Sequence, residues 1–450
     1  MMAGRHNKIN WPTRIAWAKP RSRAISGSLP DAGAAPKRCF SVALSPISLT
    51  LDQLMLIATM ALLGFGLLMT QSANARIGRF IHDWPLRLVM NVEAIHAVLA
   101  IALLAFLWRL DYRRLLGNSL IRSVPTVLMA ASMVFLALVL TRLGTDINGA
   151  KRWLLLRIGS HALSFEPSEL AKWSLVLFIS SYAVHRGEQI RSFWKGFVPL
   201  MMVVGATSAL ILKEDFGTAA LVAGIAALLM LMAGCRWWHL AILVPPVLVV
   251  LYFAVWHVPY RRERLLIFMH PHMDPKGAGY NPIQSLLSFA SGGFWGRGLG
   301  NGIQKMGYLP EDNTDFIFSL IAEELGFFGC IVVILLYLTL VFSGWQVMHR
   351  SQDMFGKLLA FGCTAVIALQ AAMNIAVVTV TVPTKGIALP LISSGGTGWI
   401  LTAGAIGLVM SVERINRLKY AENNARPPSI AGTSLPMRLE THNSASRSSV

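Results

Sequence analysis

Five acidic side chains crowd into fourteen consecutive residues in the second half of the chain. They belong to the stretch LPEDNTDFIFSLIAEELGFFG (309–329) and are Glu311, Asp312, Asp315, Glu323 and Glu324. After the third acid the sequence is apolar except for the two glutamates, and a carboxylate inside an apolar span indicates a function by default, because its burial is costly. Two structural explanations compete: a helix cap for the aspartate, and a buried bridge from the glutamates to a basic partner.

If a helix begins at Asp315, Ser319 and Glu323 follow at i+4 and i+8, so one stripe of that helix is polar. With a rise of 1.5 Å per residue, Glu323 would lie roughly 12 Å deeper than Asp315.

The composition predicts the elements that must position these acids. Of 450 residues, 54% are hydrophobic and 14% are charged, whereas a soluble domain carries about 25% charged residues. A membrane-spanning helix needs about 20 apolar residues. Ten runs approach that length: 51–70, 87–108, 123–141, 168–184, 196–212, 216–234, 239–257, 315–343, 358–381 and 398–412. We expect an all-α polytopic membrane protein with ten transmembrane helices in one domain, 49–419.

Both ends of the chain differ from this domain. Residues 1–48 are basic without the apolar segment of a signal peptide, and 420–450 are polar and rich in Pro and Ser, so we expect disordered tails. An even number of spans puts both tails on the side of the basic short loops, which the positive-inside rule makes cytoplasmic. The net charge of +18 then reflects topology, and anionic lipid headgroups rather than nucleic acid are the expected partner. The four cysteines show no disulfide or zinc spacing.

Five segments are external in this topology: 71–86, 142–167, 213–215, 258–314 and 382–397. The long loop 258–314, between spans seven and eight, departs from the rule because it contains six cations. These are Arg261, Arg262, Arg264, Lys276, Arg297 and Lys305. They either bind an anionic ligand or extend along the interface with their heads in water.

Three short motifs place charge at the external ends of the spans. NGAKRWL (148–154) joins Lys151 and Arg152 to Trp153, which suits either an interfacial belt or a phosphate. FEPSELAK (165–172) is typical of a helix start at Pro167, and Glu169 and Lys172 can pair at i,i+3. In KEDFGTA (213–219), Asp215 precedes a new helix and suits its dipole.

Three further segments are rich in turn residues. YNPIQSLLSFASGG (280–293) predicts an interfacial amphipathic helix with Asn281 as N-cap and Pro282 at N1. GRGLGNG (296–302) follows no strand, which excludes a dinucleotide-binding fold and favours a flexible hinge. VPTKGIALPLISSGGTGW (382–399) contains two prolines and paired glycines, and irregular backbone at membrane depth is tolerated only against protein or a watered cavity.

GAKRWL, EPSELAK, DFGTA, NTDFIFSLIAEELG and PTKGIALPLISSGG follow one another in this order over 50–419. On these motifs the chain resembles the SEDS family (shape, elongation, division and sporulation), first its division-type members and next its elongation-type members, which share every motif. The chain departs from the family pattern at Asp312 and Asn313 (usually Ala-His), at Ser394 (usually Tyr) and at Glu166 (usually Gln).

The resemblance implies an inverting glycosyltransferase that polymerises lipid II into β-1,4 glycan strands at the outer face of the inner membrane, at the division septum. It implies a class B penicillin-binding protein transpeptidase and other division proteins as partners, and Asp315 as the catalytic carboxylate. Lys151, Arg152, Lys385 and a divalent cation (Mg²⁺ or Mn²⁺) are the candidates for neutralising the leaving pyrophosphate. The other substrate-binding candidates in these motifs are Trp153, Glu169, Lys172, Asp215, Gln284, Ser285, Thr314, Thr384 and Ser393.

Two functions of other classes compete with the enzyme. Ten spans with intramembrane charge also suit a lipid II flippase, but a transporter should keep its charges near the midplane, and here they cluster at the outer ends of the spans. A scaffold that only recruits the transpeptidase would not need Asp315.

Overall fold

The computed structural model describes residues 42–44, 47–74, 92–147, 150–158, 161–310, 313–383, 385–394 and 396–425. Most of both predicted tails, most of loop 71–86, and Glu311, Asp312 and Thr384 lie outside these residues. The described residues from Ala43 onward belong to one compact unit.

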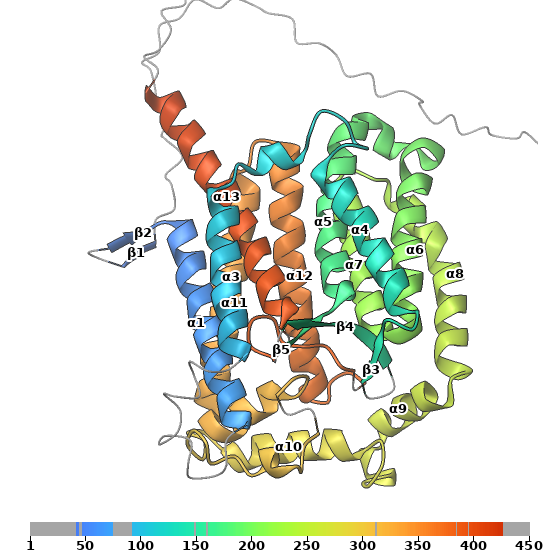
Figure 1. Cartoon of the computed structure of the whole chain (residues 1–450), viewed down its shortest axis with the longest axis vertical. Coiled ribbons are helices and arrows are strands. Elements are labelled where there is room, and N and C mark those ends of the chain that lie inside the picture. The colour runs from blue at the N-terminus through green and yellow to red at the C-terminus, as the bar shows by residue number, and fades with distance from the viewer. Residues whose placement is uncertain are drawn as a thin grey trace, which may run out of the picture. The chain divides into compact units, whose positions relative to one another are not determined.

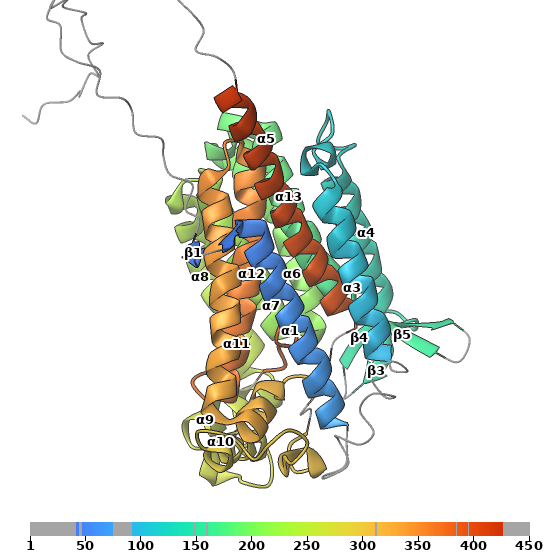
Figure 2. The same ribbon diagram turned by 90° about the vertical axis from the view of Figure 1, so that its left-hand side faces the viewer.

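Within the described residues, every one of the ten apolar runs coincides with a helix (Figure 1). The helices are α1 (Leu51–Ala73), α3 (Val92–Arg109), α4 (Val124–Val139), α5 (Pro167–Arg186), α6 (Val198–Glu214), α7 (Phe216–Met232), α8 (Trp237–Trp256), α11 (Ile317–Arg350), α12 (Met354–Val378) and α13 (Thr397–Ala425). They lie side by side as a bundle in which α3 packs on α13, α1 and α12 on α11, and α4 on α5 (Figures 1 and 2). The mainly helical architecture is confirmed.

Six helical segments of the described chain are long and apolar enough to cross a membrane: α1, α3, Phe193–Glu214, α11, α12 and α13. Three shorter apolar helices, Val124–Val139, Phe216–Met232 and Trp237–Phe253, fall below the length criterion. The first turns of α5 contain the charged residues Glu169 and Lys172, so its apolar sequence begins only after them. The structure therefore supports a polytopic protein, and the count of ten spans stays a prediction.

The segment 142–167 is more ordered than the predicted loop. Its described residues form an antiparallel sheet in the order β3-β4-β5, from Thr145–Ile147, Ala150–Ile158 and His161–Phe165. A second small sheet pairs β1 (Val42–Leu44) with β2 (Ile47–Leu49). The purely all-α expectation was wrong in these places. In β4 the apolar run is too short to span a membrane, and its backbone pairs with β3 and β5 instead.

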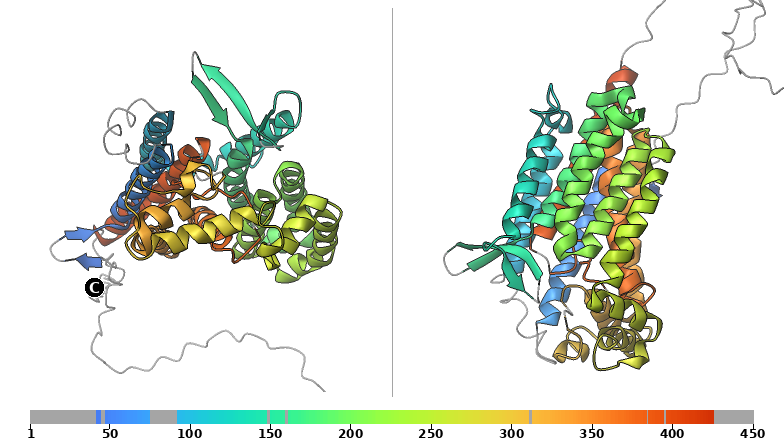
Figure 3. Two further views of the ribbon diagram at one scale, coloured as in Figure 1. Left: turned by 90° about the horizontal axis from the view of Figure 1, so that it is seen from below. Right: turned by 90° about the vertical axis from the view of Figure 1, so that its right-hand side faces the viewer.

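The long loop 258–314 contains α9 (Pro259–Met269) and α10 (Tyr280–Gly292), which lie at the same end of the bundle as the β3–β5 sheet (Figures 1 and 3). The helix predicted at 280–293 is confirmed, but its N-cap is Gly279 and not Asn281. Pro282 is tolerated inside the first turn because backbone N–H groups there have no partner within the helix. Leu286 and Leu287 are exposed, so the apolar face of α10 points away from the protein.

Candidate active site

Asp315 lies directly before α11, at the end of the bundle that holds the sheet and α10. The N-cap position of α11 is Phe316, one residue after Asp315. The backbone carbonyl of Asp315 accepts a hydrogen bond from Asn374 Nδ2 of α12 at 2.8 Å. Its carboxylate lies against Gly386, where an added Cβ would stand 2.5 Å from Asp315 Oδ2.

The irregular loop that follows α12 closes over this position. Ser393 Oγ donates to the carbonyl of Thr314 at 2.5 Å and accepts from Leu389 N at 2.7 Å. The backbone N–H of Ser394 donates to the carbonyl of Asn313 at 2.9 Å. Ser393 therefore holds the loop on the residues before α11, and two of the positions that depart from the family pattern touch each other.

A polar cavity of about 100 Å³ opens beside the carboxylate of Asp315. Many residues predicted from separate motifs line it together: Arg152, Trp153, Glu169, Lys172, Asp215 and Thr314. These side chains come from β4, α5, the start of α7 and the segment before α11. The fold thus brings motifs more than 150 residues apart in the sequence into one charged site.

Arg152 and Asp215 form one edge of this cavity. Arg152 Nη1 lies 3.3 Å from Asp215 Oδ2, and Arg152 Nη2 donates to the carbonyl of Glu214 at 3.2 Å. Asp215 also accepts from the backbone N–H groups of Gly217 and Thr218 at 2.8 and 3.1 Å, which confirms it as the N-cap of α7. The backbone of Lys151 donates to Glu214 Oε2 at 3.0 Å, so β4 is tied to the end of α6.

Glu169 and Lys172 form the predicted i,i+3 pair in the first turns of α5. Lys172 Nζ lies 2.7 and 2.8 Å from the two carboxylate oxygens of Glu169 and donates to Gln370 Oε1 at 2.6 Å. Lys172 is buried, and these three hydrogen bonds match the three donors of an ammonium group. In this structure Lys172 therefore neutralises Glu169 and binds α5 to α12.

Glu166 adds a further carboxyl to the same cavity. It is the N-cap residue of α5 and accepts a hydrogen bond from Ser168 Oγ at 2.6 Å. Burial raises the pKa of Glu166 to about 7, and the negative charge of Glu169 adds to this shift. The pKa of this carboxyl therefore lies near neutral pH.

A larger cavity of about 820 Å³ adjoins the polar one. Arg152, Asp215 and Gly386 line both cavities. Apolar side chains of α8 form a wall of the larger cavity, among them Leu248, Leu251, Tyr252 and Trp256. Four cations also line it: Arg152, Lys213, Arg264 and Lys385. Lys385 Nζ lies 3.2 Å from the centre of the Phe216 ring, a cation–π contact.

Some predicted substrate-binding residues lie apart from both cavities. Ser285 Oγ is buried between helices, where it donates to Val378 O at 2.6 Å and lies 2.7 Å from Ser319 Oγ. Gln284, its neighbour on α10, lines neither cavity. Thr384 lies outside the described residues.

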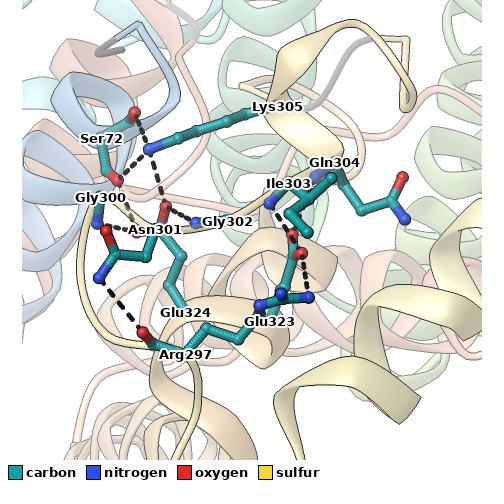
Figure 4. A network of polar contacts seen from close by, with 10 residues as sticks. All are labelled: Ser72, Arg297, Gly300, Asn301, Gly302, Ile303, Gln304, Lys305, Glu323 and Glu324. Carbon is teal, nitrogen blue, oxygen red and sulfur yellow. Dashed lines mark hydrogen bonds and ion pairs between the residues drawn. The ribbon is translucent and has the colours of Figure 1, made fainter. Parts of the chain in front are cut away.

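Glu323 and Glu324 belong to a separate, buried network (Figure 4). Glu324 pairs with Lys305 Nζ at 3.0 Å and accepts from Ser72 Oγ of α1 at 2.5 Å. Glu323 lies 3.9 Å from Arg297 Nη1. The explanation of the two glutamates as a structural bridge is confirmed. The predicted polar stripe has two separate partners, because Ser319 bonds to Ser285 of α10 and Glu323 to the backbone of Ile303, which follows the glycine-rich segment.

The glycine-rich segment 296–302 and the two residues after it donate backbone hydrogen bonds to both glutamates. The backbone N–H groups of Gly300 and Gly302 donate to Glu324 at 3.0 and 3.2 Å, and those of Ile303 and Gln304 donate to Glu323 at 2.8 and 3.2 Å. A Cβ at Gly302 would stand 2.9 Å from Glu324 Oε1, so the approach needs glycine. The interpretation as a flexible hinge was wrong, since the loop binds two carboxylates of its own chain.

The described part of the chain contains no group of three or more His, Cys, Asp or Glu side chains that could hold a metal ion. Around the polar cavity, Asp215 is committed to Arg152 and Glu169 to Lys172. These residues do not form a metal-binding set by themselves.

Two residues of α12 that contact the site were missed by the sequence analysis. Gln370 binds Lys172, and Asn374 binds the backbone of Asp315. Their signal was a pair of amides one turn apart in the apolar run ALQAAMNIA (368–376). Such amides usually bond across helices in a membrane protein.

Comparison with known proteins gives the family. Residues 52–418 match the sequence profile of the FtsW/RodA/SpoVE family, described as "Cell cycle protein". A relative from Geobacter metallireducens is 37% identical over 363 residues, which cover 80% of this chain and 94% of the relative. A relative from Idiomarina loihiensis is 34% identical over 372 residues, which cover 82% and 88%. Both are named "Probable peptidoglycan glycosyltransferase FtsW".

Solved structures agree with this assignment. One similar chain comes from the structure titled "Structural coordination of polymerization and crosslinking by a peptidoglycan synthase complex". It has a TM-score of 0.64 and 28% identity, and the match covers 80% of this chain and 97% of the other. The rod shape determining protein RodA of Thermus thermophilus aligns with a TM-score of 0.56 and 26% identity, covering 80% and 96%. The chain therefore belongs to the FtsW/RodA/SpoVE family of SEDS proteins and is similar to relatives named FtsW.

Proposed function

We propose that this protein is a peptidoglycan glycosyltransferase that polymerises lipid II into β-1,4 glycan strands at the outer face of the inner membrane, during septal synthesis. The names of the FtsW relatives support the activity and the division role over elongation. The observation that carries the proposal is the carboxylate of Asp315 against Gly386, a residue that lines both the polar cavity and the larger cavity.

The larger cavity has the two surfaces that a lipid-linked pyrophosphate needs. Its α8 wall is apolar and suits a prenyl chain, while Arg152, Lys213, Arg264 and Lys385 provide positive charge for phosphate oxygens. Arginine can bind such oxygens bidentately, and lysine acts as a point charge. We therefore assign the donor lipid to this cavity, with its anomeric carbon toward Gly386 and Asp315.

In the reaction, the 4-hydroxyl oxygen of the acceptor sugar attacks the anomeric carbon of the donor. The bond from that carbon to the pyrophosphate oxygen breaks, and the hydroxyl proton passes to the carboxylate of Asp315. A single displacement inverts the anomeric centre and needs only one carboxylate, unlike the paired acids of glycosidases. Positive charge from Arg152 and Lys385 stabilises the leaving pyrophosphate.

In this proposal a divalent cation enters with the substrate as a counter-ion of the pyrophosphate. Mg²⁺ is commonly bound by one or two carboxylates together with substrate phosphates, and the described residues around the polar cavity include no group of three or more His, Cys, Asp or Glu that could hold the ion alone. No step of the proposed reaction depends on it.

The arrangement of the bundle supports the proposed topology. The β3–β5 sheet, α9 and α10 lie at one end, and the C-terminal end of α13 lies at the other (Figure 1). Near that second end, Arg417 of α13 pairs with Asp52 at the start of α1 at 2.5 Å. We propose that the first end faces outward, that both tails are cytoplasmic, and that 258–314 is external.

We further propose that the protein works with a class B penicillin-binding protein transpeptidase. The support is the similar chain from a structure whose title joins polymerisation to crosslinking. A transporter is less well supported, because the charged residues of the two cavities gather at one end of the bundle, whereas transporter sites lie near the bilayer midplane.

The test is polymerisation of purified lipid II by the purified protein, alone and with its transpeptidase, followed by gel separation of the glycan products. We expect glycan strands that disappear when Asp315 is replaced by alanine. Absence of glycan from folded wild-type protein under both conditions would overturn the proposal, and transport of lipid II across vesicles by that same protein would favour the flippase.

A further inference from the structure

Helix α12 carries two buried amide side chains, Gln370 and Asn374, four residues apart. Side chains at i and i+4 lie on the same face of a helix. This face is turned toward the site, because each amide bonds to a segment that lines the polar cavity.

Asn374 joins the two backbone segments that meet at the Asp315 carboxylate. Its Nδ2 donates to the carbonyl of Asp315 at 2.8 Å and to the carbonyl of Ile387 at 2.7 Å. Ile387 directly follows Gly386, the residue against which the carboxylate lies. A single amide group with two N–H donors thus sets the distance between the segment that carries the carboxylate and the loop that faces it.

Gln370 repeats this arrangement one turn away. Its Nε2 donates to the carbonyl of Ala388 at 2.9 Å, and its Oε1 accepts from Lys172 Nζ at 2.6 Å. The same loop is therefore held at two consecutive residues, and the Glu169–Lys172 pair is fixed to the same helix face.

We propose that Asn374 and Gln370 are positioning residues: Asn374 holds the carboxylate of Asp315 against the loop 385–388, and Gln370 holds that loop and Lys172. The expected effects on the polymerisation rate rest on the proposed glycosyltransferase function, whereas the proposed placement of Asp315 and Lys172 does not. Other polar side chains on α12 have no such role; Thr364 Oγ1, for example, bonds to Ala360 O within its own helix at 2.7 Å.

The first test uses Asn374→Asp, which keeps the shape of the side chain. The neutral carboxyl can donate one hydrogen bond to one of the two carbonyls, but the ionised form donates none and repels both. We expect the rate of lipid II polymerisation to lie roughly tenfold or more below that of wild type at both pH 6 and pH 8, since each protonation state loses at least one of the two hydrogen bonds and a small misplacement of a reacting group can cost about 100-fold. The KM for lipid II should change little.

Two controls separate positioning from general damage. Asn301→Asp makes the same chemical change at an exposed amide, and Thr364→Val removes a polar group from the same helix. Both should keep a rate near that of wild type at pH 6 and pH 8. If Asn374→Asp also keeps the wild-type rate at both pH values, the proposal is overturned.

The second test needs no enzymatic activity. In a background with Cys39→Ser, where the three remaining cysteines are buried, the thiol introduced by Asp315→Cys is labelled with a water-soluble maleimide. We expect Asn374→Ala to change its labelling rate several-fold and Thr364→Val to leave it unchanged. If Asn374→Ala does not fold, Asn374→Asp replaces it. Its labelling rate is then divided by that of the Asp315→Cys protein with Asn374 intact at the same pH, because the thiolate is the reactive form and labelling itself speeds up with pH.

The outcomes distinguish the two proposals. An unchanged labelling rate in folded protein would overturn the positioning role, even if the wild type polymerises lipid II. A changed labelling rate in a protein whose wild type makes no glycan would overturn the proposed function and leave the positioning role in place.

Discussion

The carboxylate of Asp315 lies so close to Gly386 that a Cβ at Gly386 would stand 2.5 Å from Asp315 Oδ2 and 3.3 Å from its Cγ. The atoms in conflict would be the end of one side chain, which can turn aside at low cost to the fold. Glycine at this position thus lets the proposed base face the point where the two cavities adjoin.

Gly386→Ala should therefore lower polymerisation at least tenfold, because displacement of a reacting group by about 1 Å can cost about 100-fold in rate. Thermal unfolding in detergent should change little. Gly398→Ala is the matched control, since a Cβ at Gly398 would stand 3.9 Å from Glu169, an ordinary contact. Full activity of Gly386→Ala would show that the carboxylate does not need this approach.

Arg152→Ala should weaken the use of lipid II much more than Arg122→Ala. Arg152 lines both cavities, whereas Arg122 is exposed in a loop on the proposed cytoplasmic side. Loss of a charge-assisted contact to phosphate should cost about 1.5–3 kcal/mol, or roughly ten- to hundredfold in kcat/KM. Asp215→Asn keeps the helix cap but loses the ion pair with Arg152. It therefore measures how much of the loss in kcat/KM comes from the broken ion pair and not from the lost contact to phosphate. Equal losses for the two arginine variants would refute the contact.

Glu166 should make the stability of the protein depend on pH near neutrality. Its pKa is raised to about 7, so between pH 4.5 and 7 the folded state binds a proton that the unfolded state has released. Stability contributed by this proton is present at low pH and lost as pH rises through 7. Glu166→Gln should remove this part of the dependence, on the order of 1–3 kcal/mol between pH 5 and pH 8. The measurement is the unfolding temperature of the wild type and of Glu166→Gln at pH 5 and pH 8. The same change of unfolding temperature with pH in the two proteins would contradict the prediction.

Lys305→Met should destabilise the fold strongly, because Glu324 would keep a buried charge without its cation. Breaking one partner of a buried pair typically costs about 3–5 kcal/mol. The double variant Lys305→Met, Glu324→Leu should recover part of the loss. Lys276→Met changes an exposed lysine of the same loop and should leave the unfolding temperature nearly unchanged. A similar unfolding temperature for the Lys305 and Lys276 variants would argue against the network as a structural bridge.

The sequence predicted the features that depend on local spacing. The helices follow from the lengths of apolar runs, and the Glu169–Lys172 pair and the Asp215 cap follow from spacings of three residues or fewer. Motif order placed Arg152, Asp215 and Asp315 in one site although nothing local connects them.

The sequence could not give contacts between distant segments. Ser72 binds Glu324 across 252 residues, and no pattern near either residue names the other. The glycine loop was misinterpreted for the same reason, because the anion that it binds is supplied by α11. Gln370 and Asn374 were missed because a pair of amides in an apolar run predicts hydrogen bonds to another segment but does not identify that segment.

The most direct test of the account is the rate of lipid II polymerisation by purified Asp315→Asn protein. The substitution keeps the size of the side chain and removes the base, so we expect normal folding and a rate lower by about 10²- to 10⁴-fold. A rate above about a tenth of the wild-type value would contradict the assignment of Asp315 as the general base, since loss of a positioned base costs at least about 10²-fold.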